Sequence, residues 1–337
     1  MVGLKIRFGK ARQALLIVES VTSTDAVAAE YRALTEGCGV LDRSERGKLS
    51  LTGGEAKSFL QGQVSNDVEA LSPGQGCYAA FLTPKGKMLG DLRVLDAGEE
   101  LLLDTERVAL QELFNMIRRF SIGYDAQLHK RTLESGLLSL IGPESSAVMA
   151  VPGLGQSEHD HVAFSAGAIA ARAIRTDVGI DLLCTAGDTE RLRDFVCESG
   201  AVPVSEPAAE IVRVEHGRPR YGVDVDDAVI PQEAGLNARA VSFTKGCYVG
   251  QETVARLYYR GKPNRYLRGL RLDGEAASGD QLTLDGRPVG SLTSVAHSPR
   301  LGTIALALVR REAPPGTNVS VGADSSVSAE VVELPFA

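Results

Sequence analysis

Residues 245–252 read KGCYVGQE and bring a thiol, an ammonium group and two glycines into eight positions. A run rich in β-branched and aromatic residues, 241–244, precedes this octet, and residues 252–259 have helical composition. The two glycines suit a tight turn from a strand into a helix. The free N–H groups at the start of such a helix, together with Lys245, would favour a thiolate at Cys247. The alternative for Cys247 is a small apolar side chain packed beneath the turn.

The octet resembles the signature of a known family. All seven specified positions of the pattern KGCYxGQE match, and this pattern is typical of the YgfZ family, the folate-binding proteins that support iron–sulfur enzymes. The resemblance covers nearly the whole chain and includes the aminomethyltransferases, the T-proteins of glycine cleavage. Residues 59–68, FLQGQVSNDV, are similar to the FLQGQxTNDV segment of the family, with Ser65 in place of threonine. Further similar blocks lie in the same order at 41–49, 76–78, 83–88, 213–222 and 230–236.

This resemblance implies a fold and a division into domains. We expect an α+β protein with the multi-lobed aminomethyltransferase (GcvT)-like fold and a small C-terminal β-barrel. The folate-binding region would span residues 1–260 in two lobes, one formed by 1–135 with 200–260 and the other by 136–199. The barrel would span 261–337, because short β-type runs alternate with turn clusters beyond Gly261.

The hydrophobic pattern predicts the individual elements. Helices are expected at 55–61, 106–119, 189–198 and 208–216, and strands at 48–51, 78–82, 88–95, 100–103, 137–141, 168–174 and 180–183. The segment 143–160 contains proline and glycine and is expected to be a loop. The apolar run 14–18 is too short for a signal peptide or a membrane span, so we interpret it as a strand and expect no membrane association.

Composition favours a soluble globular protein. The chain has 337 residues, of which 44% are hydrophobic and 23% charged, with a formal net charge of −7. This charge does not favour nucleic-acid binding by the surface as a whole. Five cysteines form an odd set without a CxxC pair, which indicates a reducing, cytoplasmic compartment rather than a disulfide framework.

Motifs for several other chemistries are absent from the sequence. It contains no GxGxxG fingerprint, no phosphate-binding P-loop, no HExxH and no GxSxG elbow. Residues 158–161, EHDH, are expected to be solvated in an exposed loop rather than to bind a metal ion. Cys247 alone cannot hold an iron–sulfur cluster, which normally takes four protein ligands, so a role with clusters must involve other ligands or another protein.

The resemblance implies two acidic residues for folate. A pterin ring presents an N–H and an amino group side by side, and a carboxylate can accept from both. Asp181 occupies the acidic position of a shortened RTGYTGEDGxEL-like block at 175–182, and Asp91 lies in a GGxxDDL-like block at 86–92, where Gly90 replaces one acid. The alternative for both aspartates is the solvent-exposed face of a strand.

A local basic segment follows the octet. Between residues 253 and 272 there are six arginines and lysines, Arg256 among them, three tyrosines and no acids. Such a segment suits an anion, which could be the folate glutamate tail, a partner protein or RNA, with direct tRNA binding included. The alternative is a solvated basic face.

Together these observations predict an accessory protein that binds tetrahydrofolate or a derivative. It would support assembly or repair of iron–sulfur clusters in client enzymes, including radical enzymes that thiolate tRNA. Cys247 would react as a thiolate, and Lys245 would stabilise that thiolate or contact an anion. The folate contacts would come from Asp181, Asp91, Tyr248, Gln251, Glu252 and Arg256. The first alternative is a folate-dependent one-carbon transferase that uses Asp91, and the second is a non-catalytic interaction scaffold.

Overall fold

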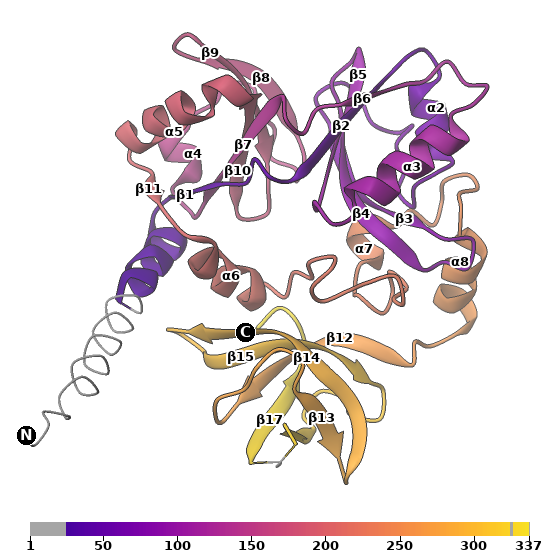
Figure 1. The fold of residues 1–337 in the computed structure, drawn as a ribbon, viewed down its shortest axis with the longest axis vertical. Helices are drawn as coiled ribbons and strands as arrows, with labels where there is room; N and C mark the ends of the chain where they lie inside the picture. Colours follow the sequence, from indigo (N-terminus) through magenta and orange to yellow (C-terminus); the bar gives the residue numbers. More distant parts are fainter. Residues whose placement is uncertain (1–24, 324–325, 337) are drawn as a thin grey trace, which may run out of the picture.

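Three β-sheets organise the residues that the structure describes, 25–323 and 326–336, in this computed structural model (Figure 1). Two open sheets form lobes that lie side by side, and a closed barrel lies beneath them. Helices cover the open sheets, so the protein is α+β with the expected C-terminal barrel. The expected strand at 14–18 lies outside the described residues. Within the described part of the chain, no helix is long and apolar enough to cross a membrane.

The first lobe is a five-stranded antiparallel sheet in the order β3-β4-β5-β2-β6. Its buried core contains Leu51, Phe59, Phe81 and Leu113, which come from both the sheet and its helices. Helix α3 begins at residue 110 and not at 106 as expected, because residues 107–109 form a turn. The elements are β2 (Gly47–Thr52), α2 (Ala56–Gln61), β3 (Gly76–Leu82), β4 (Met88–Asp96), β5 (Glu100–Thr105), α3 (Leu110–Phe120) and β6 (Gln127–Lys130).

The second lobe is a six-stranded sheet in the order β11-β1-β7-β10-β9-β8. Its first strand, β1, comes from residues before the first lobe and pairs with β7 and β11. Strand β8 was not expected, and it forms an antiparallel hairpin with β9. The elements are β1 (Gly39–Asp42), β7 (Ser135–Ile141), α4 (Ser145–Val148), β8 (His161–Ala166), β9 (Ile169–Arg175), β10 (Gly179–Thr185), η1 (Ala186–Asp188), α5 (Thr189–Glu198) and β11 (Val202–Pro203).

The C-terminal barrel closes in the order β12-β15-β14-β13-β16-β17. Leucine, valine and alanine side chains fill its interior, among them Leu270, Leu292 and Val331. Closure pairs every strand edge, so the barrel leaves none of these strands unpaired. The strands are β12 (Arg265–Leu272), β13 (Gln281–Leu284), β14 (Arg287–Ser298), β15 (Gly302–Arg310), β16 (Asn318–Val321) and β17 (Val327–Val332).

Helix α6 (Glu206–Glu215) joins the lobes to the barrel (Figure 1). Its apolar side chains pack in one core with residues of the barrel and of the helix at 25–36. At its end, the buried Glu215 accepts hydrogen bonds from Tyr31 Oη at 2.9 Å and from Ser298 Oγ. This helix therefore fixes the position of the barrel against the second lobe.

The octet lies in the turn that follows α7 (Asn237–Ala240) and in the first two residues of α8 (Gln251–Arg260). The expected strand at 241–244 is not formed, because these residues pair with a loop and not with a sheet: Ser242 N donates to Ser65 O at 3.0 Å. Gly250 caps α8 with φ of 86° and packs directly on the turn between β3 and β4. A glycine is required there both by the positive φ and by the close approach of the two backbones.

Gly250→Ala should lower the free energy of unfolding by about 2–5 kcal/mol, because strain at positive φ adds to steric overlap. A Cβ at Gly250 would lie 2.6 Å from Thr83 O and 3.0 Å from Leu82 Cβ. Gly235→Ala is the matched control, since Gly235 has φ of 71° but no atom within 4 Å of the added Cβ. Urea titrations of the three proteins measure the difference. Equal losses for the two variants would show that the close approach costs nothing.

Candidate functional site

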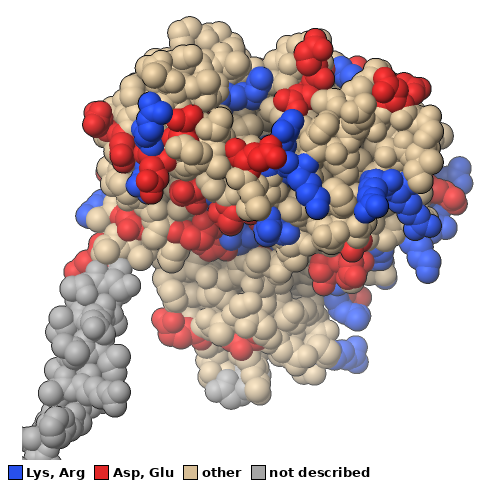
Figure 2. Space-filling view, turned by 45° about the horizontal axis from the view of Figure 1, so that its top comes forward, with Lys and Arg blue, Asp and Glu red and all other residues tan. Residues whose placement is uncertain are grey.

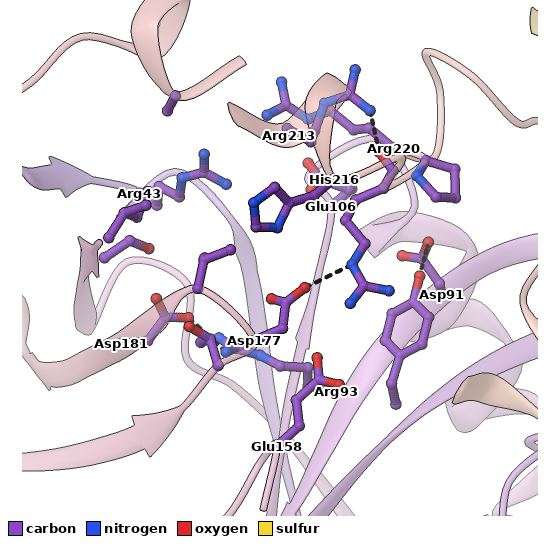
Figure 3. A pocket seen from close by; sticks show the side chains of 18 of the residues that line it. Arg43, Asp91, Arg93, Glu106, Glu158, Asp177, Asp181, Arg213, His216 and Arg220 are labelled. Atoms are coloured by element: carbon purple, nitrogen blue, oxygen red, sulfur yellow. Dashed lines mark hydrogen bonds and ion pairs between the residues drawn. The ribbon is translucent and has the colours of Figure 1, made fainter. Parts of the chain in front are cut away.

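A central pocket lies where the two lobes meet the segment that leads from α6 to the barrel (Figure 3). It has a volume of about 220 Å³. Figure 3 shows Asp181 and Asp177 on one wall and Asp91 on the opposite wall, with Arg93 between them. Charged and aromatic side chains dominate the lining, including Arg43, Arg46, Tyr78, Glu106, Glu158, His159, Arg213, His216, Arg218, Arg220 and Arg239.

A buried guanidinium connects the two lobes beside this pocket. Arg93 on β4 donates from Nη1 to Asp181 Oδ2 on β10 at 2.6 Å, and from Nε to Asp104 Oδ2 on β5 at 2.9 Å. Arg46 Nε donates to the other oxygen of Asp104 at 2.7 Å. Burial opposes ionisation of Asp104, but Arg46 and Arg93 outweigh it and lower the pKa of Asp104 to about 2.

Asp91 lies on the first-lobe wall and forms a short pair with a tyrosine. Tyr78 Oη donates to Asp91 Oδ2 at 2.6 Å, and Asp91 is 5% exposed. Burial raises the pKa of Asp91 to about 6, although the hydrogen bond from Tyr78 acts in the opposite direction. Burial and the neighbouring carboxylate also raise the pKa of Tyr78 well above its ordinary value. This pair therefore holds a proton more readily than an exposed aspartate would.

Asp181 lies on the opposite wall and is 8% exposed. Its Oδ2 accepts from Arg93, and no partner for its Oδ1 is found among the described residues. Asp91 likewise uses one oxygen in a side-chain hydrogen bond. Neither aspartate lies on a solvent-exposed strand face, so the alternative raised from the sequence does not apply to them.

The expectation of a solvated loop at 158–161 is wrong, because both histidines of this segment are buried. His161 is 3% exposed, and its ring contacts Gln75 O at 3.2 Å and Arg172 Nη1 at 2.7 Å. His159 is 6% exposed and lines the central pocket. Within the described ranges, no cluster of three or more His, Cys, Asp or Glu side chains could hold a metal ion.

Lys245 does not line the pocket, and its ammonium group is enclosed by backbone. Nζ donates to Gln61 O at 2.5 Å, to Val64 O at 2.7 Å and to Asn66 O at 2.8 Å. Burial lowers the pKa of Lys245 to about 8. The three carbonyls belong to the FLQGQVSNDV segment, so this lysine joins the two most distinctive segments of the sequence.

The other residues of the octet separate into buried and exposed positions. Tyr248 is buried in a core with residues of α7 and β3, and Gln251 is half-buried. Cys247, Glu252 and Arg256 are exposed. None of these described residues lines the central pocket. The residues expected to form one site thus lie in two places, Asp91 and Asp181 in the pocket and the octet at the start of α8, outside the pocket.

The basic segment 253–272 has two parts, one paired with acidic residues on β12 and one exposed at α8. On β12, Arg265 pairs with Glu233 at 3.2 Å and Arg268 with Glu333. At α8 and just after it, the exposed residues are Arg256, Tyr258, Tyr259, Arg260 and Lys262. Figure 2 shows Lys and Arg side chains gathered at the right-hand edge, the side on which α3 and α8 lie in Figure 1. An anion-binding role is therefore restricted to the α8 end of the segment.

Sequence reasoning did not identify Tyr78, Arg93 or His159 as site residues. Tyr78 and Arg93 were both visible as polar positions in apolar runs, GCYAAFL and MLGDLRVLD. A charge in a strand that is otherwise buried is expensive unless it is paired, which is a usable signal for a buried ion pair. The partner of Arg93 in the other lobe could not be read from this signal.

Family comparisons cover both parts of the chain. The model of the GCVT N-terminal domain matches residues 7–245, and that of the glycine cleavage T-protein C-terminal barrel domain matches residues 265–337. The aminomethyltransferase of Synechococcus sp. (strain CC9311) is 30% identical over 332 residues, which are 91% of this chain and 89% of that protein. A protein of Arabidopsis thaliana, named as a suspected chloroplastic transferase, is 29% identical over 331 residues, 95% of this chain and 75% of that protein.

One solved structure has the same fold. The crystal structure of glycine cleavage system aminomethyltransferase T from Bartonella henselae superposes with a TM-score of 0.83 at 24% identity. The superposition covers 92% of this chain and 89% of the other. At this identity the likeness concerns the fold alone, including the position of the barrel beneath two sheet lobes.

Lys245→Met should lower the free energy of unfolding by about 2–4 kcal/mol, because three buried carbonyl groups would lose their donor. Lys87→Met is the control, since Lys87 is about one-third exposed and donates to one carbonyl, Ala228 O at 2.7 Å. It should cost about 0.5 kcal/mol or less. Denaturant unfolding measures both. If Lys245→Met were as stable as the parent, the structural role would be contradicted. The role expected from the sequence, stabilising the Cys247 thiolate or contacting an anion, would then be the better interpretation.

Asp91→Asn should gain stability relative to the parent as the pH rises from about 4 to about 6. The native carboxyl, with its raised pKa, binds its proton more tightly than the unfolded chain does, so the parent loses stability across this window. The gain of Asp91→Asn in free energy of unfolding relative to the parent should reach about 2–3 kcal/mol, and it should stay constant at pH values above this window. Urea unfolding at several pH values tests this.

Asp104→Asn is the control of opposite sign. The pKa of Asp104 is lowered to about 2, so its stabilising effect is present above about pH 4 and is lost as the pH falls towards 2. The free energy of unfolding of the parent should therefore increase relative to that of Asp104→Asn as the pH rises. The same pH trend for both variants would contradict the two assignments.

Proposed function

This chain belongs to the glycine cleavage T-protein (GCVT) family, and from that premise we propose that its central pocket binds tetrahydrofolate or a derivative. One observation carries the proposal. Seven buried side-chain atoms in the described part of the chain lack a hydrogen-bond partner, and four of them belong to residues that line this pocket. They are Arg43 Nε, Arg239 Nε and both ring nitrogens of His159. Unpaired buried polar atoms are rare, and a polar ligand would satisfy them.

The carboxylates of the pocket fit the same ligand. Asp91 and Asp181 lie on opposite walls, and each uses one oxygen in a side-chain hydrogen bond. A free carboxylate oxygen in a buried setting accepts strongly from N–H groups such as those at the pterin edge. The arginines near the α6 side of the pocket, Arg218 and Arg220, pair with Asp177 and Glu206 in this structure, and they are the cations on this side that the carboxylates of the glutamate tail would contact.

We further propose that the protein is an accessory factor for iron–sulfur enzymes, as the YgfZ-type octet implies. Cys247 is exposed and does not line the folate pocket, so its reaction partner is a second protein and not the folate. The exposed arginines and tyrosines of α8 lie next to it in the chain and suit contact with a client or its RNA. All five cysteines are unpaired, which supports the reducing, cytoplasmic compartment of this proposal.

A second function is folate-dependent aminomethyl transfer. The Tyr78–Asp91 pair favours it, because a carboxyl with a pKa of about 6 can act as an acid or a base near neutral pH. The name of the relative from Synechococcus, an aminomethyltransferase, points in the same direction. Formation of methylene-tetrahydrofolate from tetrahydrofolate and an aminomethyl or N-methyl donor would distinguish this function from the accessory role.

Anaerobic calorimetric titration with tetrahydrofolate is the test. The parent should bind, Asp181→Asn should bind at least tenfold more weakly, and Cys247→Ser should bind as the parent does. Asp96→Asn is a matched control, because Asp96 is also a buried aspartate on β4, pairs with Lys57 at 2.8 Å and does not line the pocket. It should leave the affinity unchanged.

The client role needs its own readout. Cys247→Ser should fail to restore the activity of iron–sulfur enzymes in cells that lack the protein, although its folate affinity is intact. Restoration by Cys247→Ser would contradict the accessory role of the thiol. If the parent binds no folate at all, the pocket proposal falls and the interaction scaffold becomes the better description.

A further inference from the structure

His159 is a buried imidazole without a hydrogen bond in the wall of the central pocket. The residue is 6% exposed, and neither Nδ1 nor Nε2 has a partner among the described residues. Its nearest acidic group is Glu158, whose Oε1 lies 3.7 Å from Nε2, too far for a hydrogen bond. Glu158 is moreover engaged by Arg239. Most buried polar groups in native proteins are paired, so this ring requires an explanation.

The surroundings keep the ring neutral. Burial is the largest effect, and the nearby Arg93 and Arg239 act in the same direction, so that the pKa of His159 falls to about 3. Asp177 and Asp181 act in the opposite direction and do not outweigh them. At neutral pH the ring therefore carries one N–H donor and one bare nitrogen acceptor.

The backbone holds the ring at this place. His159 has φ of 73°, a conformation that few residues other than glycine adopt. Its N–H donates to Arg175 O at 2.9 Å, and Arg175 N donates to Asp160 O at 2.8 Å. On the other side, its carbonyl lies so close to β3 that a Cβ at Gly76 would be 2.9 Å from it. The second lobe thus inserts His159 against the first-lobe strand that carries Tyr78.

A comparison with His161 shows that the missing partners are not a general property of this segment. His161 is two residues away and equally buried, but both of its ring nitrogens have contacts, with Gln75 O and with Arg172. His161 does not line the pocket. Of these two histidines, therefore, only the one that lines the pocket has a ring without hydrogen-bond partners.

We propose that the neutral ring of His159 is a direct hydrogen-bonding contact of the bound ligand and recognises its pteridine ring. The inference rests on the proposed folate site and adds a residue to it. The pteridine carries neutral N–H donors and a carbonyl acceptor on one edge, which match a neutral imidazole in either tautomer. The charged glutamate tail matches the arginines of the pocket instead. His159 would thus contact the ring of the ligand, and not its anionic tail.

His159→Phe tests the contact, because phenylalanine keeps a planar ring and removes both nitrogens. We expect it to bind tetrahydrofolate at least tenfold more weakly and to lose less stability than His161→Phe does, since no protein hydrogen bond of the ring is lost and only the strain of phenylalanine at positive φ is added. His161→Phe is the matched control with the opposite expectation: lower stability, because its ring contacts are lost, and affinity within threefold of the parent.

His159→Asn is a second variant, because asparagine tolerates positive φ and keeps a donor and an acceptor. It should retain more affinity than His159→Phe. If His159→Phe cannot be purified, His159→Leu takes its place with the same expectation. Anaerobic calorimetry with tetrahydrofolate and urea unfolding measure all variants.

The outcomes separate this inference from the proposed function. If the parent binds tetrahydrofolate and the Phe and Asn variants bind equally well, only the role of His159 is overturned. If His159→Phe loses stability as His161→Phe does while its affinity is unchanged, the ring is a structural element and the inference is overturned. If the parent does not bind tetrahydrofolate, the folate pocket and the contact by His159 are both overturned.

Discussion

The guanidinium of Arg93 is the interaction on which the arrangement of the two lobes depends. It is held by Asp104 in its own sheet and by Asp181 in the other, and all three groups are buried. Burying these charges is costly, and removing one partner of such a pair typically destabilises a protein by about 3–5 kcal/mol. The network therefore requires both sheets to be in place. Because Asp181 and Arg93 also line the central pocket, the groups that join the lobes set the electrostatics of the ligand site as well.

A chain of hydrogen bonds links this pocket to the octet at the start of α8. Lys245 donates to Asn66 O, and the Asn66 side chain donates to Tyr78 O at 2.8 Å and to Arg239 O at 3.1 Å. Tyr78 and Arg239 both line the pocket. The FLQGQVSNDV segment thus lies between the central pocket and the surface that carries Cys247. Two sites that do not share a residue are held in a fixed relation by one loop.

The sequence predicted local elements and the superfamily well, because both depend on neighbouring residues. Apolar runs located β2 to β5 within a few residues, the turn clusters located the barrel, and the blocks similar to aminomethyltransferases pointed to the superfamily. Contacts between distant segments could not be read in this way. The burial of His159 and His161 results from the packing of one lobe on the other, which no local pattern encodes. From the sequence, Lys245 was expected to act on the Cys247 thiolate or on an anion. Its structural role could not be read, because the carbonyl groups that enclose it lie about 180 positions away in the sequence.

Lys245 and His159 show why burial alone does not identify a functional residue. Burial lowers the pKa of both groups, to about 8 and about 3. Lys245, however, has a carbonyl oxygen for each of its three donors, so its desolvation is compensated within the folded chain. His159 has no such partner, and the chain alone leaves its desolvation uncompensated. When the folded chain supplies hydrogen-bond partners for a buried polar group, the fold accounts for the burial of that group. When a buried polar group beside a cavity has no such partner, a ligand that enters the cavity accounts for it.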